Sequence, residues 1–190
     1  SETMKVNLKI KRFDPAESGG KTWWQEYEVD IHPDSTVLDS LIEVREQNDG
    51  TLALRCACRA SICGSCGMKV NGSAKLVCKT RVVDVAPHGE KLIIEPMGNQ
   101  HVVRDLVVSL DTFFDQINRV EPYLQPSFVP EKGEYTASNE SMENLLTSMN
   151  CIMCGCCVSD CTVLEVDANF IGPAALAKAR RFTEDPRDAK

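Results

Sequence analysis

Two groups of cysteines constrain this chain more than any other feature of its sequence. There are ten cysteines in 190 residues, and they fall within segments 56–78 and 151–161. Disulfide frameworks spread their cysteines across a fold, whereas metal ligands gather on loops. We also expect no secretion signal, because the start of the chain has neither an apolar stretch nor an arginine-rich amphipathic segment. The bunching therefore indicates bound metal rather than disulfides.

The first group has the spacing of a plant-type ferredoxin. Cys58, Cys63, Cys66 and Cys78 form the pattern C-x4-C-x2-C-x11-C. A C-x4-C-x2-C run followed by a later cysteine is typical of [2Fe–2S] proteins. The cluster needs a loop that surrounds it with three thiolates and a fourth thiolate from a neighbouring segment. The pattern therefore predicts that these four residues bind a [2Fe–2S] cluster.

Residues around these cysteines favour a raised reduction potential. Gly64 and Gly67 let the backbone approach the sulfurs, so that N–H groups can donate to them, and the Ser65 hydroxyl can add another hydrogen bond. Arg55 and Arg59 bring positive charge to the same segment. We therefore predict a potential above the ~−400 mV of plant-type ferredoxins.

The second group contains the spacing of a bacterial ferredoxin. Cys151, Cys154, Cys157 and Cys161 give C-x2-C-x2-C-x3-C. In this pattern three thiolates bind one cubane cluster and the fourth serves another cluster. The run supplies four ligands where two clusters need more, and Thr162 stands where proline usually follows. We therefore expect it to be part of a two-cluster site.

Zinc is the alternative to iron–sulfur clusters, and two cysteines remain outside both patterns. Zinc would need two C-x2-C pairs, and the pairs Cys63–Cys66 and Cys151–Cys154 lie far beyond the usual zinc-ribbon spacing. Cys56 precedes the first pattern, and Cys156 falls between ligand positions of the second. We interpret both as free buried thiols.

Alternation of apolar and polar residues predicts a small sheet before residue 102. Residues 4–13 and 26–31 have period two, which predicts two strands joined as a hairpin. Asp34 or Ser35 can cap a helix that runs to about Asn48. Together these elements predict a sheet packed against one helix.

The remaining strands of this module are short. Asn71-Gly72 is the preferred pair for a two-residue hairpin turn. We expect two more strands at 82–85 and 91–95. The first cysteine group then lies in the loop between the helix and the Asn-Gly hairpin.

From His101 the apolar period changes to 3.6. It predicts a helix of about 18 residues. A short helix ahead of Cys151 should turn four apolar side chains inward: Met142, Leu145, Leu146 and Met149. Gly172-Pro173 should open a last helix ending near Phe182. The sequence therefore predicts an α+β module at 1–102 and an all-helical module at 103–190.

Charge and hydropathy narrow the classes of partner. The net charge of −7 and a pI near 5.0 argue against nucleic acid. No apolar run approaches the ~18–20 residues that span a bilayer. We therefore expect any membrane association to come through a partner subunit.

Four segments together resemble one known family: Arg55–Gly67, Val103–Val108, Glu121–Leu124 and Cys151–Cys157. The chain is similar, over nearly its whole length, to the iron–sulfur subunit of succinate dehydrogenase and fumarate reductase. That resemblance implies a β-grasp plant-type ferredoxin domain at 1–102. It also implies an all-helical, bacterial-ferredoxin-like domain at 103–190, here incomplete.

The resemblance also implies the cofactors and partners. Single electrons would pass from the FAD of a separate flavoprotein subunit to a quinone beside a membrane-anchor subunit. The first four cysteines would bind [2Fe–2S], Cys151, Cys154 and Cys157 would bind [4Fe–4S], and Cys161 would bind [3Fe–4S]. In that family a later segment supplies the remaining ligands of the last two clusters, so we expect a C-terminal truncation.

The chain departs from the family pattern after its last cysteine. Ubiquinone-using members carry a tryptophan where this chain has Val163–Val166, which favours menaquinone. Trp23 and Trp24 lie in a predicted strand of the other module and are no substitute. The resemblance implies a peripheral location on the cytoplasmic face of a bacterial plasma membrane, held there by partner subunits.

Two alternatives of related chemistry stay open. One is an iron–sulfur subunit of another flavin-linked reductase, of the thiol or heterodisulfide type, and the other is a non-enzymatic iron–sulfur protein. The sequence has no nucleophile–base pair and no phosphate loop, so we expect no catalytic residue for a dicarboxylate in this chain. Its part in an enzyme would be electron transfer.

Overall fold

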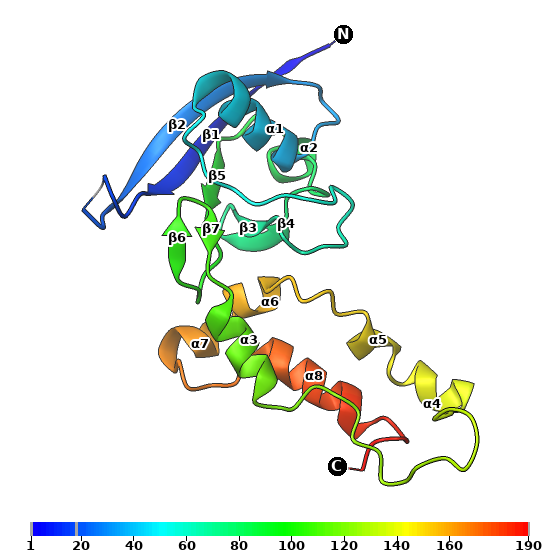
Figure 1. Cartoon of the computed structure of the whole chain (residues 1–190). Coiled ribbons are helices and arrows are strands. Elements are labelled where there is room, and N and C mark those ends of the chain that lie inside the picture. The colour runs from blue at the N-terminus through cyan, green and yellow to red at the C-terminus, as the bar shows by residue number, and fades with distance from the viewer. Residues whose placement is uncertain (1, 18, 190) are drawn as a thin grey trace. The chain divides into compact units, whose positions relative to one another are not determined.

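The computed structural model describes residues 2–17 and 19–189, which form two compact units. The first, here the sheet unit, comprises residues up to Leu110 together with Cys154–Asp160. The second, here the helical unit, comprises the remaining residues. Figure 1 labels the elements of both units.

A five-stranded mixed sheet forms the centre of the sheet unit. Its strand order is β2-β1-β5-β3-β4, with β1 and β5 parallel and the other neighbours antiparallel. The strands, including a separate two-stranded ribbon of β6 and β7, are β1 (Met4–Phe13), β2 (Thr22–Ile31), β3 (Gly67–Val70), β4 (Ser73–Leu76), β5 (Leu92–Glu95), β6 (Val102–Arg104) and β7 (Val107–Val108). The chain is therefore an α+β protein, as predicted.

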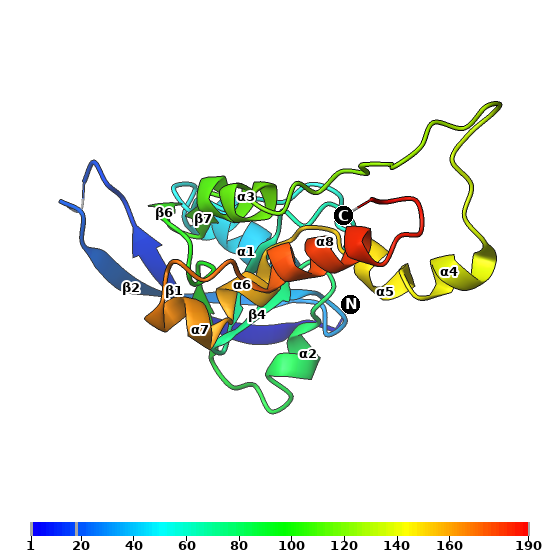
Figure 2. The same cartoon turned by 90° about the horizontal axis from the view of Figure 1, so that it is seen from below.

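Short helices complete both units. They are α1 (Val37–Glu43), the π-helix η1 (Val44–Asn48), α2 (Val82–Val85), α3 (Asp111–Asn118), α4 (Asn139–Glu143), α5 (Leu146–Met149), α6 (Cys156–Ser159), α7 (Thr162–Val166) and α8 (Pro173–Thr183). Helix α1 lies over one face of the sheet (Figures 1 and 2). Within the described part of the chain, no helix is both long and apolar enough to cross a membrane.

Both predicted hairpins are confirmed. Strands β1 and β2 pair along their full lengths, and the alternation places Leu8 and Ile10 in the core with no exposed surface. Asn71 and Gly72 join β3 to β4 with φ values of 51° and 84°. Positive φ at both central residues is what this kind of tight turn requires.

The first helix begins later than predicted. Thr36 caps α1, rather than Asp34 or Ser35. The Thr36 side chain accepts a hydrogen bond from the Asp39 N–H (3.2 Å), and the Asp39 carboxylate accepts one from the Thr36 N–H (2.8 Å). This reciprocal capping box satisfies two backbone donors. The Thr-x-x-Asp pattern therefore outcompetes the two earlier candidates.

Residues 82–85 form helix α2, and the predicted strand is wrong. The Val82 N–H bonds to the Ser35 carbonyl (3.0 Å), and the Ala86 N–H bonds back to the Val82 carbonyl (2.8 Å), which closes a helical turn. A short apolar run does not distinguish a buried strand from a buried helical turn. Tertiary contacts therefore decide its conformation.

The helix of about 18 residues predicted from His101 is wrong over its first half. Strands β6 and β7 occupy that half, and α3 begins only at Asp111. Between the strands, Asp105 has a φ of 45°, which interrupts a helix. Its buried carboxylate accepts hydrogen bonds from the backbone N–H groups of Phe13 (3.1 Å) and Ala53 (2.9 Å). These distant contacts override the local helical periodicity.

In the helical unit, α3 and α5 each contact α8. Helix α8 begins with Pro173 at its first turn, as predicted. The short helix predicted ahead of the second cysteine group is instead a pair, α4 and α5. Leu145 is fully buried, whereas Leu146 and Met149 are 53% and 42% exposed, so the predicted inward face is only partly right.

A buried arginine ties together four parts of the sheet unit. The Arg12 guanidinium is 3% exposed and donates hydrogen bonds to Asp105 (2.8 Å) and Asp49 (2.8 Å). It also donates to the Tyr27 hydroxyl, which in turn donates to Asp49 (2.7 Å). The network joins β1, β2, the turn after η1 and the turn between β6 and β7. A buried charge is tolerated here because it is fully paired.

This network makes stability depend on pH. Burial and the hydrogen bond with Asp49 raise the pKa of Tyr27 to about 12. Its contribution is complete below about pH 10, the ordinary tyrosine value, and is lost as the pH rises towards 12. Hydrogen bonds from Thr51, Tyr27 and Arg12 hold the pKa of Asp49 well below its usual range. That contribution is complete above about pH 4 and is lost as the pH falls.

We expect the alkaline loss of stability to be smaller in Tyr27→Phe. Phenylalanine cannot ionise, so the free energy of unfolding, measured by urea titration, should fall less steeply between pH 10 and pH 12 than in the wild type. Tyr123→Phe, at a residue that is 57% exposed, is the control for removing one phenol. Equal slopes for the wild type and Tyr27→Phe would contradict the assignment.

Candidate cluster-binding site

The first cysteine group occupies the loop between η1 and β3 and the turn after β4. Cys58 and Cys63 are exposed, whereas Cys66 and Cys78 are buried. The Val77 N–H bonds to the Cys66 carbonyl (3.4 Å), which brings the end of the loop beside the turn that carries Cys78. The fold thus places the later cysteine next to the C-x4-C-x2-C loop, as a four-ligand site requires.

Backbone N–H groups point at two of these sulfurs. The sulfur of Cys58 accepts three such bonds, from Ala60 (3.3 Å), Ile62 (3.4 Å) and Cys63 (3.3 Å). The sulfur of Cys78 accepts one from Ser61 (3.3 Å). Hydrogen bonds to cysteine sulfur stabilise the negative charge of a cluster and tune its potential. The donor set therefore fits an iron–sulfur group.

The loop achieves this convergence through left-handed backbone conformations. Arg59 and Ser61 have φ values of 52° and 58°, and Gly64 has a φ of 71°. A residue other than glycine in this region costs roughly 1 kcal/mol or more. Alternation of backbone conformation turns successive N–H groups towards one concave side, where they favour an anion. The strained backbone conformations thus orient the N–H donors towards the sulfurs.

The four thiols differ in acidity. The Ser65 hydroxyl lies 3.1 Å from the Cys63 sulfur, and this hydrogen bond lowers the pKa of Cys63 to about 6. Burial raises the pKa of Cys66 to about 11. Burial also acts to raise the pKa of Cys78, but hydrogen bonds from the Cys66 thiol and from Ser61 outweigh it and lower the value. The hydrogen bond predicted for Ser65 is therefore confirmed.

The structure also describes the surroundings of Arg55, Arg59 and Cys56. Arg55 donates to the backbone carbonyl of Val108 (2.7 Å), and Arg59 is exposed. Cys56 is half-buried against the core rather than fully buried. In residues 2–17 and 19–189, no group of three or more His, Cys, Asp or Glu side chains is gathered as for a single metal ion. The raised reduction potential stays a prediction, which a redox titration would check.

The second cysteine group is divided between the units. Cys154 and Cys157 belong to the sheet unit, whereas Cys151 and Cys161 belong to the helical unit. Cys156 is half-buried, and a hydrogen bond from its thiol lowers the pKa of Cys154 to about 6. The cysteine spacing alone predicted no contact between Cys156 and a ligand position.

Hydrogen bonds that the sequence did not predict fix α6 on the sheet unit. The Gly98 N–H donates to the Ser159 hydroxyl (2.9 Å), and the Asn99 amide donates to an α6 carbonyl (2.9 Å). On the other side, the Ala74 N–H donates to the Asp160 carboxylate (2.8 Å). Ser159 and Asp160 lie between the predicted ligands Cys157 and Cys161. Their polar side chains were the only feature of the sequence that could have indicated these hydrogen bonds.

Known proteins share this arrangement of sequence and fold. Residues 7–115 match the family described as 2Fe-2S iron-sulfur cluster binding domain. Over 186 residues the chain is 37% identical to the fumarate reductase iron-sulfur subunit of Mycobacterium tuberculosis (strain CDC 1551 / Oshkosh), a match that covers 97% of this chain and 74% of that protein. This chain belongs to the iron–sulfur subunit family of fumarate reductase and succinate dehydrogenase.

A solved structure supports the same family. A chain of the Mycobacterium smegmatis Sdh1 complex in the apo form is similar, with a TM-score of 0.87 and 26% identity, over 100% of this chain and 78% of that chain. The predicted resemblance is therefore confirmed. The chain is an electron-transfer iron–sulfur subunit of a succinate/fumarate oxidoreductase, rather than either of the two alternatives left open by the sequence.

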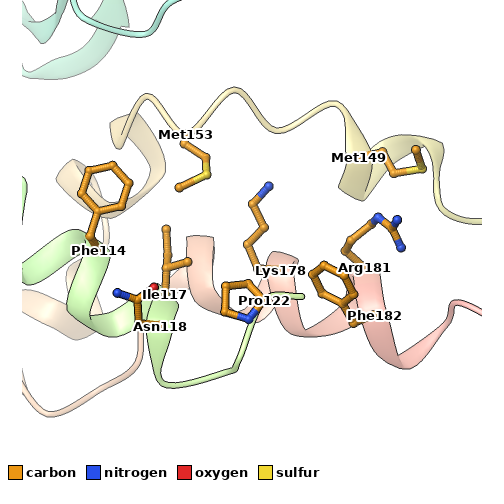
Figure 3. A pocket seen from close by; sticks show the side chains of 9 residues that line it. All are labelled: Phe114, Ile117, Asn118, Pro122, Met149, Met153, Lys178, Arg181 and Phe182. Atoms are coloured by element: carbon orange, nitrogen blue, oxygen red, sulfur yellow. The ribbon is translucent and has the colours of Figure 1, made fainter. Parts of the chain in front are cut away.

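The helical unit of this family member also has a cavity of about 290 Å³. Figure 3 shows it between α3, α8 and the segment that runs from α5 to Met153. Phe114 and Ile117 line it from α3, and the Lys178 side chain extends into it from α8. The cavity thus combines apolar walls with two cationic side chains, Lys178 and Arg181, and the amide of Asn118.

Proposed function

We propose that this subunit relays single electrons from the FAD of a flavoprotein subunit to a membrane quinone. The observation that carries the proposal is the convergence of three backbone N–H groups on the sulfur of Cys58, within a plant-type cysteine pattern. Iron–sulfur clusters carry one electron at a time, so they can connect a two-electron flavin to a two-electron quinone. The protein supplies thiolates, donors and spacing.

Each cluster has proposed ligands in this chain. They are Cys58, Cys63, Cys66 and Cys78 for [2Fe–2S], Cys151, Cys154 and Cys157 for [4Fe–4S], and Cys161 for [3Fe–4S]. Further ligands for the last two clusters would come from outside the residues described.

The strands and helices of the two parts of the chain support a more detailed proposal for the fold of each. A mixed sheet with central parallel strands β1 and β5 and one helix across its face supports a β-grasp ferredoxin domain at 1–102. The helices that follow support a bacterial-ferredoxin-like domain at 103–190. The boundary between 102 and 103 stays a prediction.

The partners would be a flavoprotein subunit and one or more membrane-anchor subunits, with no nucleic acid. On α7, directly after Cys161, Val163 and Val166 are 50% and 90% exposed. These apolar side chains are available to a partner, and the absence of tryptophan there supports menaquinone. The subunit would lie on the cytoplasmic face of a bacterial plasma membrane.

Reconstitution with both kinds of partner tests this function. We expect iron and acid-labile sulfide in the assembled complex, and cluster signals in electron paramagnetic resonance (EPR) spectra after reduction with succinate. Menaquinone analogues should accept the electrons. Zinc without sulfide, or clusters that dithionite reduces in the complex and succinate does not, would refute the proposal.

A further inference from the structure

The loop of the first cysteine group touches the second group directly, at Gly64. A Cβ atom placed on Gly64 would lie 2.9 Å from the Cα and 3.0 Å from the Cβ of Cys154. Carbon atoms in favourable contact are about 3.5–4.0 Å apart. The main chain of the [2Fe–2S] loop therefore packs against the main chain of Cys154 with no space for a methyl group.

Gly67 makes a second contact with the same segment, at which a side chain would be easier to accommodate. Its added Cβ would lie 3.4 Å from the Cys154 carbonyl oxygen and 3.0 Å from the Met97 sulfur. The end of a methionine side chain can move aside, whereas a backbone cannot. Gly64 is therefore the position at which the spacing of the two segments is least adjustable.

The segment that begins at Cys154 is also held at its far end, at Ser159 and Asp160. The Ser159 hydroxyl accepts a hydrogen bond from the Gly98 N–H, and the Asp160 carboxylate accepts one from the Ala74 N–H. Both anchor the Cys154–Asp160 segment to the sheet unit that carries the first site. Because the segment is anchored, a side chain at position 64 would be resisted rather than accommodated.

We propose that Gly64 is a positioning residue that sets the spacing between the [2Fe–2S] site and Cys154, so that an electron crosses at this backbone contact. The inference rests on the proposed function. Cys58, Cys63, Cys66 and Cys78 would hold [2Fe–2S] and Cys154 would help to hold [4Fe–4S]; one electron passing between them would oxidise the first group and reduce the second. No bond is made or broken, and no proton moves.

The competing explanation is that position 64 needs glycine only for its backbone conformation. Gly72 separates the two explanations. It has a φ of 84°, close to the 71° of Gly64, but an added Cβ there would meet nothing within 4 Å. Gly72→Ala therefore carries comparable backbone strain without the clash, and it is the matched control for Gly64→Ala.

Two measurements on the assembled complex test the proposal. The first is EPR spin relaxation of the [2Fe–2S] signal, which a second reduced cluster nearby accelerates. The second is hydrogen exchange of the amides of Cys154–Asp160. In Gly64→Ala we expect loss of the accelerated relaxation and faster exchange in that segment, with the iron content of the first site retained. Gly72→Ala should match the wild type in both.

A second variant approaches the contact from the opposite side. Ser159→Ala combined with Asp160→Ala removes two anchors of the segment without adding bulk to the [2Fe–2S] loop. This double variant should also lose the accelerated relaxation. It therefore tests the proposal even if Gly64→Ala fails to fold. Wild-type relaxation and exchange in folded Gly64→Ala, or in the double variant, would overturn the inference. A wild-type complex that lacks either the [2Fe–2S] or the [4Fe–4S] cluster would instead refute the proposed function.

Discussion

Replacing Cys78 with alanine is expected to remove the [2Fe–2S] cluster, whereas the same change at Cys56 is expected to leave it in place. Cys78 is the fourth thiol of the plant-type pattern, and its sulfur accepts the Ser61 N–H (3.3 Å) beside the buried Cys66. Without that sulfur the cluster would lack one of its four thiolates. Loss of the cluster should therefore be nearly complete.

Cys56 provides a stringent control because it lies in the same group and has the same chemistry. It is half-buried against the core and falls outside the C-x4-C-x2-C-x11-C pattern. Iron and sulfide content, visible absorbance and the [2Fe–2S] EPR signal of both variants would be measured in the assembled complex. A Cys78→Ala protein with a full [2Fe–2S] signal, or a Cys56→Ala protein without one, would show that the ligand assignment is wrong.

Asp105→Asn is expected to destabilise the sheet unit strongly. The Asp105 carboxylate is 1% exposed. One oxygen accepts from Arg12 and the Phe13 N–H, and the other accepts from Arg12 and the Ala53 N–H. An asparagine amide would turn an NH2 group towards donors in either orientation. It would also leave the buried guanidinium with only one of its two carboxylates.

Breaking a buried ion pair by removing one partner typically costs about 3–5 kcal/mol. We expect a loss of that size in the free energy of unfolding of Asp105→Asn, measured by urea titration at pH 7. Asparagine also tolerates a positive φ, so the substitution changes charge and hydrogen bonding more than backbone strain.

Asp84→Asn is the control for this prediction. It removes the carboxylate of an ion pair with Arg81 (2.8 Å) in which both side chains are about half exposed. Pairs of this kind contribute little to stability, so the unfolding midpoint should change little. If Asp105→Asn were as mild as Asp84→Asn, the Arg12 network would not hold the sheet unit together in the way described.

The elements predicted correctly from the sequence are those whose cause is local. Alternation over residues 4–13 buries every second side chain, and Asn71-Gly72 supplies two residues that accept positive φ. Pro173 begins α8 because its missing N–H costs nothing in a first turn. Each of these effects acts between residues that are close in sequence.

The wrong predictions have distant causes. The apolar stripe after His101 has a helical period, but Asp105 is held by Arg12, 93 positions earlier in the chain. Residues 82–85 are helical, and the Val82 N–H at their start bonds to the distant Ser35 carbonyl. In both cases a buried polar group had to be satisfied, and that requirement outweighed local preference.

The sequence by itself determined the ligand chemistry. Cysteine spacings of two to four residues are short enough to restrict loop geometry on their own, so C-x4-C-x2-C and C-x2-C-x2-C-x3-C are sufficient to indicate clusters. Only the tertiary structure decided how the two groups meet. It assigned Cys154–Asp160 to the sheet unit and brought Cys154 against Gly64, 90 positions away. Hydrogen bonds from Gly98 and from Ala74 hold the same segment, and no local pattern encodes them.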